Sequence, residues 1–383
     1  MTGQFPIASE LEKLKPIPLG PLPDSPLVSI LMPNYNYGQY IGEAIESVLN
    51  QTYQNFEIVI CDDGSTDNSL EVIRRYAERD SRIKYIAKEN GGMASALNVA
   101  YRESKGSIVC LLDSDDIFLP DKIEKIISAF LQDRAAGMCV HKVLPVDCST
   151  RPINNPLPKT IDHGWIGLTA LRNGGRCNLP PTSGISLRRE VAELIFPIPL
   201  IFRRVADGYV RSCVPMVTQV IALPNVLALY RLHGDNITGV LKVSTTSIEK
   251  VIEDYMLIAE ATRDFLRGLY GLEVAKVLNI EDFPGYWEHL IALYILKGKP
   301  KEYFIRDILK KLPHGIRKVI WVVLCYLPIG VAQKILELWW GNSRLKLIYK
   351  KLNLKQDIML SQKFLFSNSG MSKHKMADIL ELS

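Results

Sequence analysis

Short apolar runs alternate with amphipathic segments between residues 27 and about 144, and this alternation constrains the fold more than any other feature. The apolar runs are typical of strands and cover residues 28–32, 56–61, 83–86 and 107–112. Other segments repeat apolar residues three and four positions apart, as one face of a helix does, and cover residues 41–49, 67–77, 94–104 and 120–131. Strands that alternate with helices form βα units. The sequence therefore predicts an α/β fold, a mostly parallel sheet flanked by helices, with residues 107–112 as a central strand.

Acidic segments follow three of these strands at the edge where parallel sheets bind ligands. The segments are Pro33-Asn34-Tyr35-Asn36, Asp62-Asp63-Gly64-Ser65-Thr66-Asp67 and Asp113-Ser114-Asp115-Asp116. Five carboxylates packed at one edge would repel one another unless a cation, hydrogen-bond donors or water compensated them. Oxygen ligands suit Mg²⁺ or Mn²⁺, so the pattern predicts a divalent metal site. A turn followed by a helix cap is the alternative for residues 62–67, and capping is the role we expect for Asp67.

The charge of the chain is concentrated in one segment. The net charge of +5 is too small for a dedicated nucleic-acid binder. Residues 297–355 carry fourteen Lys and Arg against three acids, a local charge of +11, which leaves the remainder at −6. This asymmetry predicts an anionic partner for the basic segment, and we expect the anionic cytoplasmic face of a membrane. The alternative is a helical subdomain that packs on the catalytic domain.

An apolar run at residues 319–332 lies between basic residues and is followed by Trp339 and Trp340, which suit a membrane interface. Fourteen helical residues would extend about 21 Å, less than the roughly 30 Å core of a bilayer, and Pro328 interrupts them. We therefore expect peripheral membrane contact and no spanning helix. The seven cysteines form no CxxC pair, which favours buried free thiols in a reducing compartment.

Four regions are expected along the chain. Residues 1–25 form a flexible, Pro-rich leader without the apolar stretch of a signal peptide, which predicts a cytoplasmic protein. Residues 26–240 form the catalytic domain, residues 241–366 a helical, basic region, and residues 367–383 a disordered, polar tail.

Five segments, in order, resemble the family 2 glycosyltransferases, which are inverting nucleotide-sugar enzymes with the GT-A fold. The segments are Val28-Ser29-Ile30-Leu31-Met32-Pro33-Asn34-Tyr35-Asn36, Ser47-Val48-Leu49-Asn50-Gln51-Thr52, Asp62-Asp63-Gly64-Ser65-Thr66-Asp67, Asn90-Gly91-Gly92 and Asp113-Ser114-Asp115-Asp116. The resemblance covers residues 26–239 and implies a GT-A domain with a helical C-terminal extension.

The resemblance implies a nucleotide site built from the first two strand ends. Pro33 and Tyr35 would line the nucleotide pocket, with Tyr35 near the base. Asp63 is similar to the family carboxylate that accepts a hydrogen bond from uracil.

The resemblance also implies a metal and phosphate site. Asp115 and Asp116 resemble the DxD-type pair, in which one carboxylate contacts ribose or metal-bound water and the last one ligates the metal. Asp113 fits the first position of this motif, so the two carboxylates that touch Mn²⁺ or Mg²⁺ stay open. His233 is a candidate third ligand, and Arg231 a candidate phosphate partner.

An inverting transfer needs a general base for the acceptor hydroxyl. The resemblance implies Asp207, although Ala206 stands where the family often has an acid. The small residues Thr182-Ser183-Gly184-Ile185-Ser186 resemble the strand that faces the acceptor and leaves room for a sugar.

The function that we expect is metal-dependent, inverting sugar transfer in polysaccharide or glycoconjugate biosynthesis. The donor would be a nucleotide sugar, with UDP as the expected nucleotide, and the acceptor a hydroxyl of a glycan or a lipid-linked molecule. A degenerate family member that binds nucleotide sugar or acts as a scaffold is one alternative, favoured only by Ala206. A sugar-1-phosphate nucleotidyltransferase is another, but it requires a Gly-rich, basic loop after the first strand, which residues 33–36 do not supply.

Overall fold

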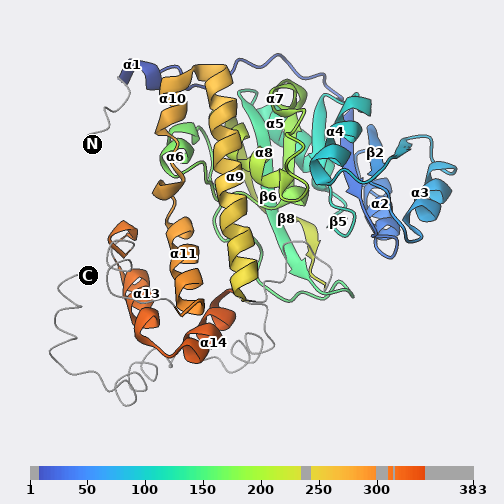
Figure 1. Cartoon of the computed structure of the whole chain (residues 1–383). Coiled ribbons are helices and arrows are strands. Elements are labelled where there is room, and N and C mark those ends of the chain that lie inside the picture. The colour runs from blue at the N-terminus through green and yellow to red at the C-terminus, as the bar shows by residue number, and fades with distance from the viewer. Residues whose placement is uncertain (1–7, 234–242, 299–308, 314, 341–383) are drawn as a thin grey trace. The chain divides into compact units, whose positions relative to one another are not determined.

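The computed structural model describes residues 8–233, 243–298, 309–313 and 315–340, and its helices and strands are shown in Figure 1. The strands are β1 (Val28–Asn34), β2 (Phe56–Asp62), β3 (Ile83–Ala87), β4 (Ile108–Leu111), β5 (Ile117–Phe118), β6 (Ala136–Val146), β7 (Ile185–Arg188) and β8 (Gln219–Arg231). The helices are α1 (Ala8–Leu11), α2 (Ile41–Leu49), α3 (Ser69–Ala77), α4 (Met93–Glu103), α5 (Lys122–Gln132), α6 (Gly167–Arg172), α7 (Arg189–Ile195), α8 (Ala206–Cys213), α9 (Thr245–Tyr270), α10 (Leu272–Val277), α11 (Pro284–Leu296), α13 (Ile316–Tyr326) and α14 (Ile329–Trp340).

The eight strands form one sheet in the order β3-β2-β1-β4-β7-β6-β8-β5. The first four are parallel to one another, and β4 lies inside the sheet, as the alternating pattern predicts. The prediction of a mostly parallel sheet is too simple for the other half. There β7 is antiparallel to both β4 and β6, and β5 is antiparallel to β8. The sheet is therefore mixed, because the later strands do not follow the regular βα alternation.

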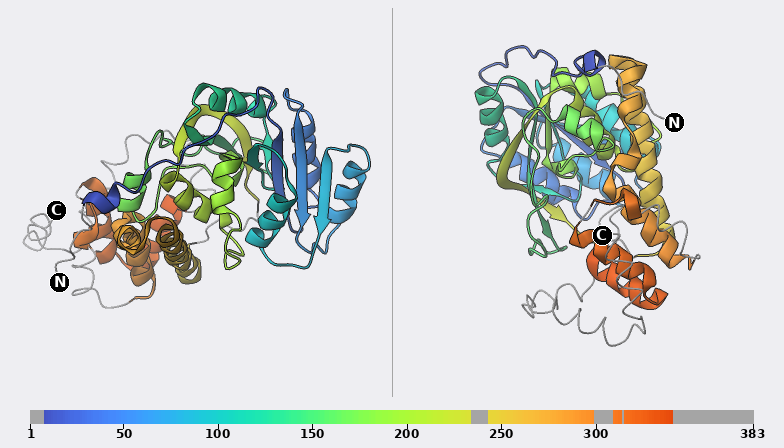
Figure 2. Two further views of the ribbon diagram at one scale, coloured as in Figure 1. Left: turned by 90° about the horizontal axis from the view of Figure 1, so that it is seen from above. Right: turned by 90° about the vertical axis from the view of Figure 1, so that its left-hand side faces the viewer.

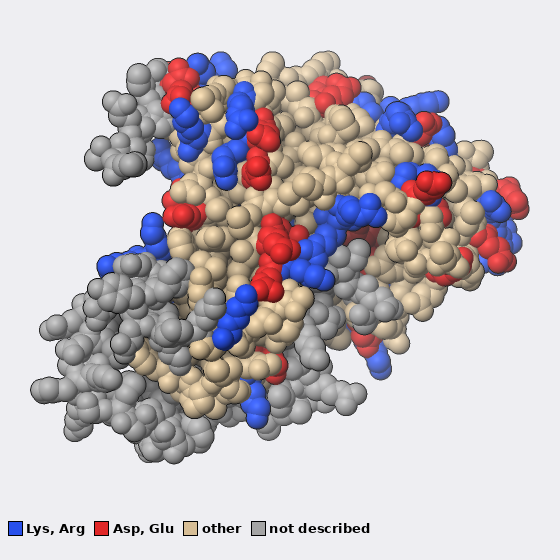
Figure 3. Space-filling view, viewed as in Figure 1, with Lys and Arg blue, Asp and Glu red and all other residues tan. Residues whose placement is uncertain are grey.

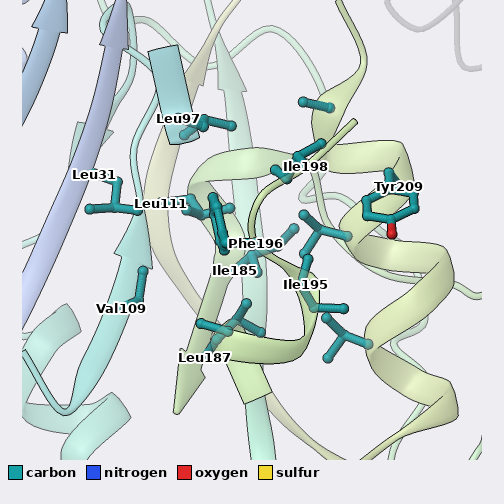
Figure 4. Close-up of a cluster of buried hydrophobic side chains, with 14 of the residues drawn as sticks. Leu31, Leu97, Val109, Leu111, Ile185, Leu187, Ile195, Phe196, Ile198 and Tyr209 are labelled. Carbon is teal, nitrogen blue, oxygen red and sulfur yellow. The ribbon is translucent and has the colours of Figure 1, made fainter. Parts of the chain in front are cut away.

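Helices cover both faces of the sheet because alternate residues of each buried strand point to opposite sides. Leu31 of β1 and Val109 of β4 pack against α4, α7 and α8, and Figure 4 shows this cluster with Tyr209 of α8. Ile30 of β1 and Ile58 of β2 belong to a second cluster with residues of α2, α3 and α5. The view from above in Figure 2 shows helices on the two sides of the sheet.

The chain forms two compact units, which divide it differently from the boundary predicted at residue 240. The first comprises Met1–Ile237 with Leu257–Asn279, and the second comprises Thr238–Met256 with Ile280–Ser383. Residues 257–279, expected in the helical region, therefore pack with the sheet.

Residues 12–25 are attached to the first unit at several points although most of them are exposed, in contrast to the flexible leader that their proline content predicts. Leu14 is buried, and the backbone N–H of Ile17 donates to the carbonyl oxygen of Val217 at 2.8 Å. The Nη2 atom of Arg188 donates to the carbonyl oxygen of Gly20. Apolar side chains between the prolines thus attach this segment to the first unit. The predicted tail at 367–383 lies outside the described residues.

The cysteines are free thiols, and five of them are buried, as predicted. Cys148 is exposed and Cys177 is half-buried, so burial does not extend to all seven. The apolar run at 319–332 divides between α13 and α14 on either side of Pro328. Across the described parts of the chain, no helix is both long enough and apolar enough to cross a membrane.

Candidate active site

Three strand ends meet at the carboxyl edge of the parallel strands. The side-chain Nδ2 of Asn34, at the end of β1, donates to Oδ1 of Asp62, at the end of β2, at 2.7 Å. The hydroxyl of Ser114, after β4, donates to the carbonyl oxygen of Pro33 at 2.8 Å. Asp62 also accepts hydrogen bonds from Ser65, so its carboxylate holds the turn after β2. The predicted convergence of the acidic segments is therefore confirmed.

Asp63 anchors the turn between β3 and α4. Its two carboxylate oxygens accept the backbone N–H groups of Gly91 at 2.9 Å and Gly92 at 2.7 Å, and its Oδ1 also accepts from Lys88. The side chain is only 4% exposed. Gly92 has φ = +88°, and a Cβ there would lie 2.5 Å from Cα of Arg203, so glycine is required for this approach. Contact of Asp63 with uracil stays a prediction.

The acid loop, residues 113–116, is fixed by groups from β8 and from the residues before β7. Oδ2 of Asp116 accepts the Ser183 hydroxyl at 2.6 Å, and Oδ1 accepts the backbone N–H of Arg231 at 2.9 Å. The same Ser183 oxygen accepts the N–H of Asp113 at 3.1 Å. Oδ2 of Asp115 lies 2.9 Å from Nε2 of His233. The acid loop is thus held from both neighbouring elements.

The carboxyl groups of the acid loop are buried close enough to one another to raise their pKa values. Burial raises the pKa of the Asp116 carboxyl well above its ordinary value, and the charges of Asp115 and Asp113 raise it further. Burial likewise raises the pKa of Asp113, followed by the charges of Asp115 and Asp207. Burial and the same three acids of the loop also raise the pKa of Tyr37. A positive charge bound here would favour the ionised carboxylates.

Arg231 is buried and directed into the protein. Its Nε donates to the carbonyl oxygen of Asp115 at 2.8 Å, its Nη1 to that of Cys148 at 2.7 Å, and its Nη2 to Oε2 of Glu43 at 2.5 Å. Its guanidinium also lies over the ring of Tyr40. This arrangement supports the acid loop. A phosphate contact by Arg231 stays a prediction.

His233 lies among aromatic rings at the end of the described stretch of residues 8–233. Its ring stacks on Tyr40 at 4.8 Å between centroids and meets Tyr37 edge-on at 5.7 Å. Residues 234–242, which follow it, lie outside the described residues. The buried imidazole is thereby oriented toward Asp115.

Asp207 lies in the first turn of α8, where the chain enters the helix through Val205 with φ = +52°. Its Oδ2 lies 3.2 Å from Nη2 of Arg211, one turn further along the helix, and its side chain is 13% exposed. The charge of Asp207 is one of the causes that raise the pKa of the Asp113 carboxyl. The role of Asp207 as a base stays a prediction.

Within the described residues, no group of three or more His, Cys, Asp or Glu side chains has the geometry of a metal site. Of the predicted ligands Asp113, Asp116 and His233, the histidine is paired with Asp115 instead. The donor chemistry nevertheless fits a hard divalent ion, because buried carboxylates repel one another here and oxygen ligands suit Mn²⁺ and Mg²⁺. The residues present therefore fit the ion in their chemistry.

The remaining predicted residues differ in their exposure. Pro33 is half-buried, and Tyr35 is 46% exposed at the edge of the sheet. Gly184 does not leave room for a ligand, because a Cβ there would lie 2.5 Å from Cβ of Pro180. Residues 182–184 form a buried 3₁₀ turn rather than part of the predicted strand. The small residue at position 184 makes room for Pro180 and for the backbone of His141, and not for a ligand.

Sequence reasoning missed two residues of this site, Tyr37 and Lys122, and the contact that Ser183 makes with the acid loop. Tyr37 could have been found from its position two residues after Tyr35. Lys122 is fully buried, although the helical pattern of α5 gives no sign of a buried cation. The contact of Ser183 with residue 116 joins segments 67 positions apart, which local patterns do not predict.

Comparison with known proteins places these residues in a wider group. Residues 29–193 match Glycosyl transferase family 2. A stretch of 214 residues, 55% of this chain, is 37% identical to an uncharacterized glycosyltransferase of Nostoc sp. and covers 66% of it. A stretch of 129 residues, 34% of this chain, is 44% identical to chondroitin synthase of Pasteurella multocida and covers 13% of it. The chain thus spans less than two thirds of the length of these relatives.

Solved structures of S. aureus TarS share the fold. One gives a TM-score of 0.50 at 18% identity and covers 80% of this chain and 52% of TarS. A shorter TarS fragment in complex with UDP-GlcNAc also gives 0.50, at 17% identity, over 80% of this chain and 87% of the fragment. At such identities the likeness shows the fold alone.

Proposed function

Because the chain belongs, through residues 29–193, to glycosyl transferase family 2, we propose that it transfers a sugar from a nucleotide-sugar donor to an acceptor hydroxyl. The observation that carries this proposal is the acid loop at the ligand-binding edge of the sheet, where Ser183 and the backbone N–H of Arg231 hold Asp116. In this proposal Asp207, whose charge contributes to the raised pKa of Asp113, is the base beside that loop.

The acid loop would hold a divalent ion for the donor. Asp116, with Asp113 or His233, would supply its ligands, and Asp115 would contact the donor. A bound Mn²⁺ or Mg²⁺ would supply positive charge to the departing diphosphate, an interaction stronger in the transition state than in the ground state. Ser183 and the backbone of Arg231 keep Asp116 in place for this role.

Asp207 would act on the acceptor in a single displacement that inverts the anomeric carbon. The acceptor oxygen forms a bond to that carbon while the bond to the diphosphate oxygen breaks and its electron pair leaves with the nucleotide. The hydroxyl proton goes to the Asp207 carboxylate. The preceding Ala206 is buried in the core, so α8 presents one carboxylate in this turn.

The donor that we propose is a UDP-sugar, and the acceptor a glycan or lipid-linked hydroxyl in polysaccharide or glycoconjugate assembly. Asp63, Tyr35 and Pro33 would form the nucleotide pocket. The TarS fragment with UDP-GlcNAc shows that a protein of this fold holds a uridine nucleotide sugar. The resemblance to a chondroitin synthase supports a polysaccharide product.

We further propose cytoplasmic, peripheral contact of the basic region with an anionic membrane surface. Trp339 and Trp340 pack around the buried Trp321 within the second unit, so they are not the side chains that would enter a membrane. Tyr326, at the end of α13, and Ile329, at the start of α14, are exposed. On the face seen in Figure 3, basic and acidic side chains are interspersed. Flotation with anionic and neutral vesicles at low salt tests this proposal, and equal recovery with both would contradict it.

The activity is tested by measuring nucleotide release from UDP-, GDP- and dTDP-sugars, with Mn²⁺ or with a chelator. We expect release from one donor class, dependent on the ion, and a loss of about 100-fold or more in Asp116→Asn. Asp121→Asn is the matched control, because this exposed acid pairs with Lys125 on the surface. A folded wild-type protein that releases nucleotide from no donor would overturn the proposal.

A further inference from the structure

A lysine is completely buried behind the acid loop. Lys122, the first residue of α5, has no exposed surface, and its Nζ lies 3.2 Å from the centroid of the Phe118 ring. Nζ donates to the backbone carbonyl oxygen of Ser183 at 3.3 Å. Buried ammonium groups are rare because desolvation is costly, so a role for this charge is expected.

Ser183 connects this lysine to the acid loop. The same residue that receives Lys122 at its carbonyl oxygen donates its hydroxyl to Oδ2 of Asp116 and accepts the N–H of Asp113. Lys122, Ser183 and Asp116 are buried, and Asp113 is half-buried. A serine fixed at both its carbonyl oxygen and its hydroxyl has one orientation available.

We propose that Lys122 and Ser183 are a positioning pair that fixes Asp116 and the backbone of Asp113 for binding of the divalent ion. This inference rests on the proposed function. Lys122 secures the backbone of Ser183, and the Ser183 hydroxyl occupies one lone pair of Asp116 Oδ2. The carboxylate then presents its remaining lone pairs in a fixed direction. Partners that orient a metal ligand commonly contribute 10- to 100-fold in affinity or activity.

Packing alone is the competing explanation, and a neighbouring serine separates the two. Ser186 is also completely buried, but its hydroxyl contacts Sγ of Cys110 at 3.2 Å and not the acid loop. Ser183→Ala and Ser186→Ala each delete one buried hydroxyl from neighbouring positions. Only Ser183→Ala should remove hydrogen bonds of the acid loop.

The test uses two readouts on the full chain, with Ser183→Ala, Lys122→Met and the Ser186→Ala control. Hydrogen exchange at the Asp113 amide reports the loop without any ion, and we expect it to be about fivefold faster in both variants of the pair. Titration of Mn²⁺ in the presence of UDP, followed by the paramagnetic signal of the free ion, reports binding. We expect the dissociation constant to rise about 10-fold or more in both.

The outcomes separate this inference from the proposed function. If the wild type binds no Mn²⁺, the proposed metal role fails. In that case, an unchanged exchange rate of the Asp113 amide in Ser183→Ala and Lys122→Met also overturns the positioning role of the pair. A faster rate would limit that role to holding the acid loop. If the wild type binds Mn²⁺ and the variants match it, or the Ser186→Ala control changes equally, the pair has no positioning role.

Discussion

Nη2 of Arg211 lies 3.2 Å from Oδ2 of Asp207 within the first two turns of α8. This i,i+4 pair restrains the side chain of the candidate base. The charge of Asp207 also contributes to the raised pKa of the half-buried Asp113.

Asp207→Asn is expected to lower the transfer rate by about 10²–10⁴-fold, because the amide cannot take the acceptor proton. The fold should be retained, since asparagine has nearly the same volume. Initial rates at saturating donor, together with circular dichroism melting, check both statements. Glu193→Gln is the control, because Glu193 is an exposed acid of α7. A loss below about tenfold would remove Asp207 from the role of general base.

Asp63→Asn is expected to destabilise the protein even without nucleotide. The carboxylate accepts two backbone N–H groups, from Gly91 and Gly92, and an amide offers only one accepting atom. Leaving a buried donor unsatisfied costs about 1–3 kcal/mol, measurable by denaturant unfolding. Tyr35→Ala, at an exposed side chain, should weaken UDP binding with little change in stability. Unaltered stability of Asp63→Asn would show that the turn does not depend on this carboxylate.

The parallel half of the sheet and the acid edge could be predicted because they depend on local pattern. The first strand was expected at 28–32 and extends over Val28–Asn34, and the third, expected at 83–86, is Ile83–Ala87. Buried strands with both faces covered are nearly continuous apolar runs, which makes them easy to recognise.

The other parts of the site depend on contacts between distant segments. The N–H of Arg231 reaches Asp116 across 115 positions, and the β7 strand enters the sheet antiparallel. The packing of Leu14 was hidden by the proline-rich composition around it. Such pairings arise from tertiary packing, which overrides the local propensities of the segments.

Lys122→Met is expected to stabilise the protein at pH 7, although the same change should weaken ion binding. Burial lowers the pKa of Lys122 to about 8, with the thiols Cys110 and Cys139 and the carboxylate of Asp116 opposing that shift. Burial, followed by the charge of Lys122, lowers the pKa of His141 on β6. Replacing a buried charge by an apolar side chain of similar volume gains about 1–3 kcal/mol.

The pH dependence of this gain has a definite sign. Between pH 8 and 10.5 the unfolded lysine binds more protons than the folded one, so the stability of the wild type rises with pH. Lys122→Met lacks this rise, and its advantage should shrink across that window. Denaturant unfolding at pH 7, 8, 9 and 10 measures the difference. A difference that is constant across these values would contradict a lowered pKa.

Val205→Gly is expected to be more stable than Val205→Ala, the reverse of the order inside a helix. Val205 has φ = +52°, a left-handed conformation that costs a β-branched residue about 1–3 kcal/mol and still strains alanine, but is open to glycine. Both substitutions remove the partly buried side-chain packing of Val205. The difference between their unfolding free energies therefore reports the backbone strain, and we expect it to be about 1 kcal/mol.

Val210 provides the comparison for that pair, because it lies within α8 and is completely buried. There Val210→Ala should be more stable than Val210→Gly by about 1 kcal/mol, the usual helix preference. Urea unfolding of the four variants gives both differences on one scale. The same order at the two positions would mean that the chain enters α8 without strain, and that Asp207 is placed by the packing of Ala206 and Tyr209 instead.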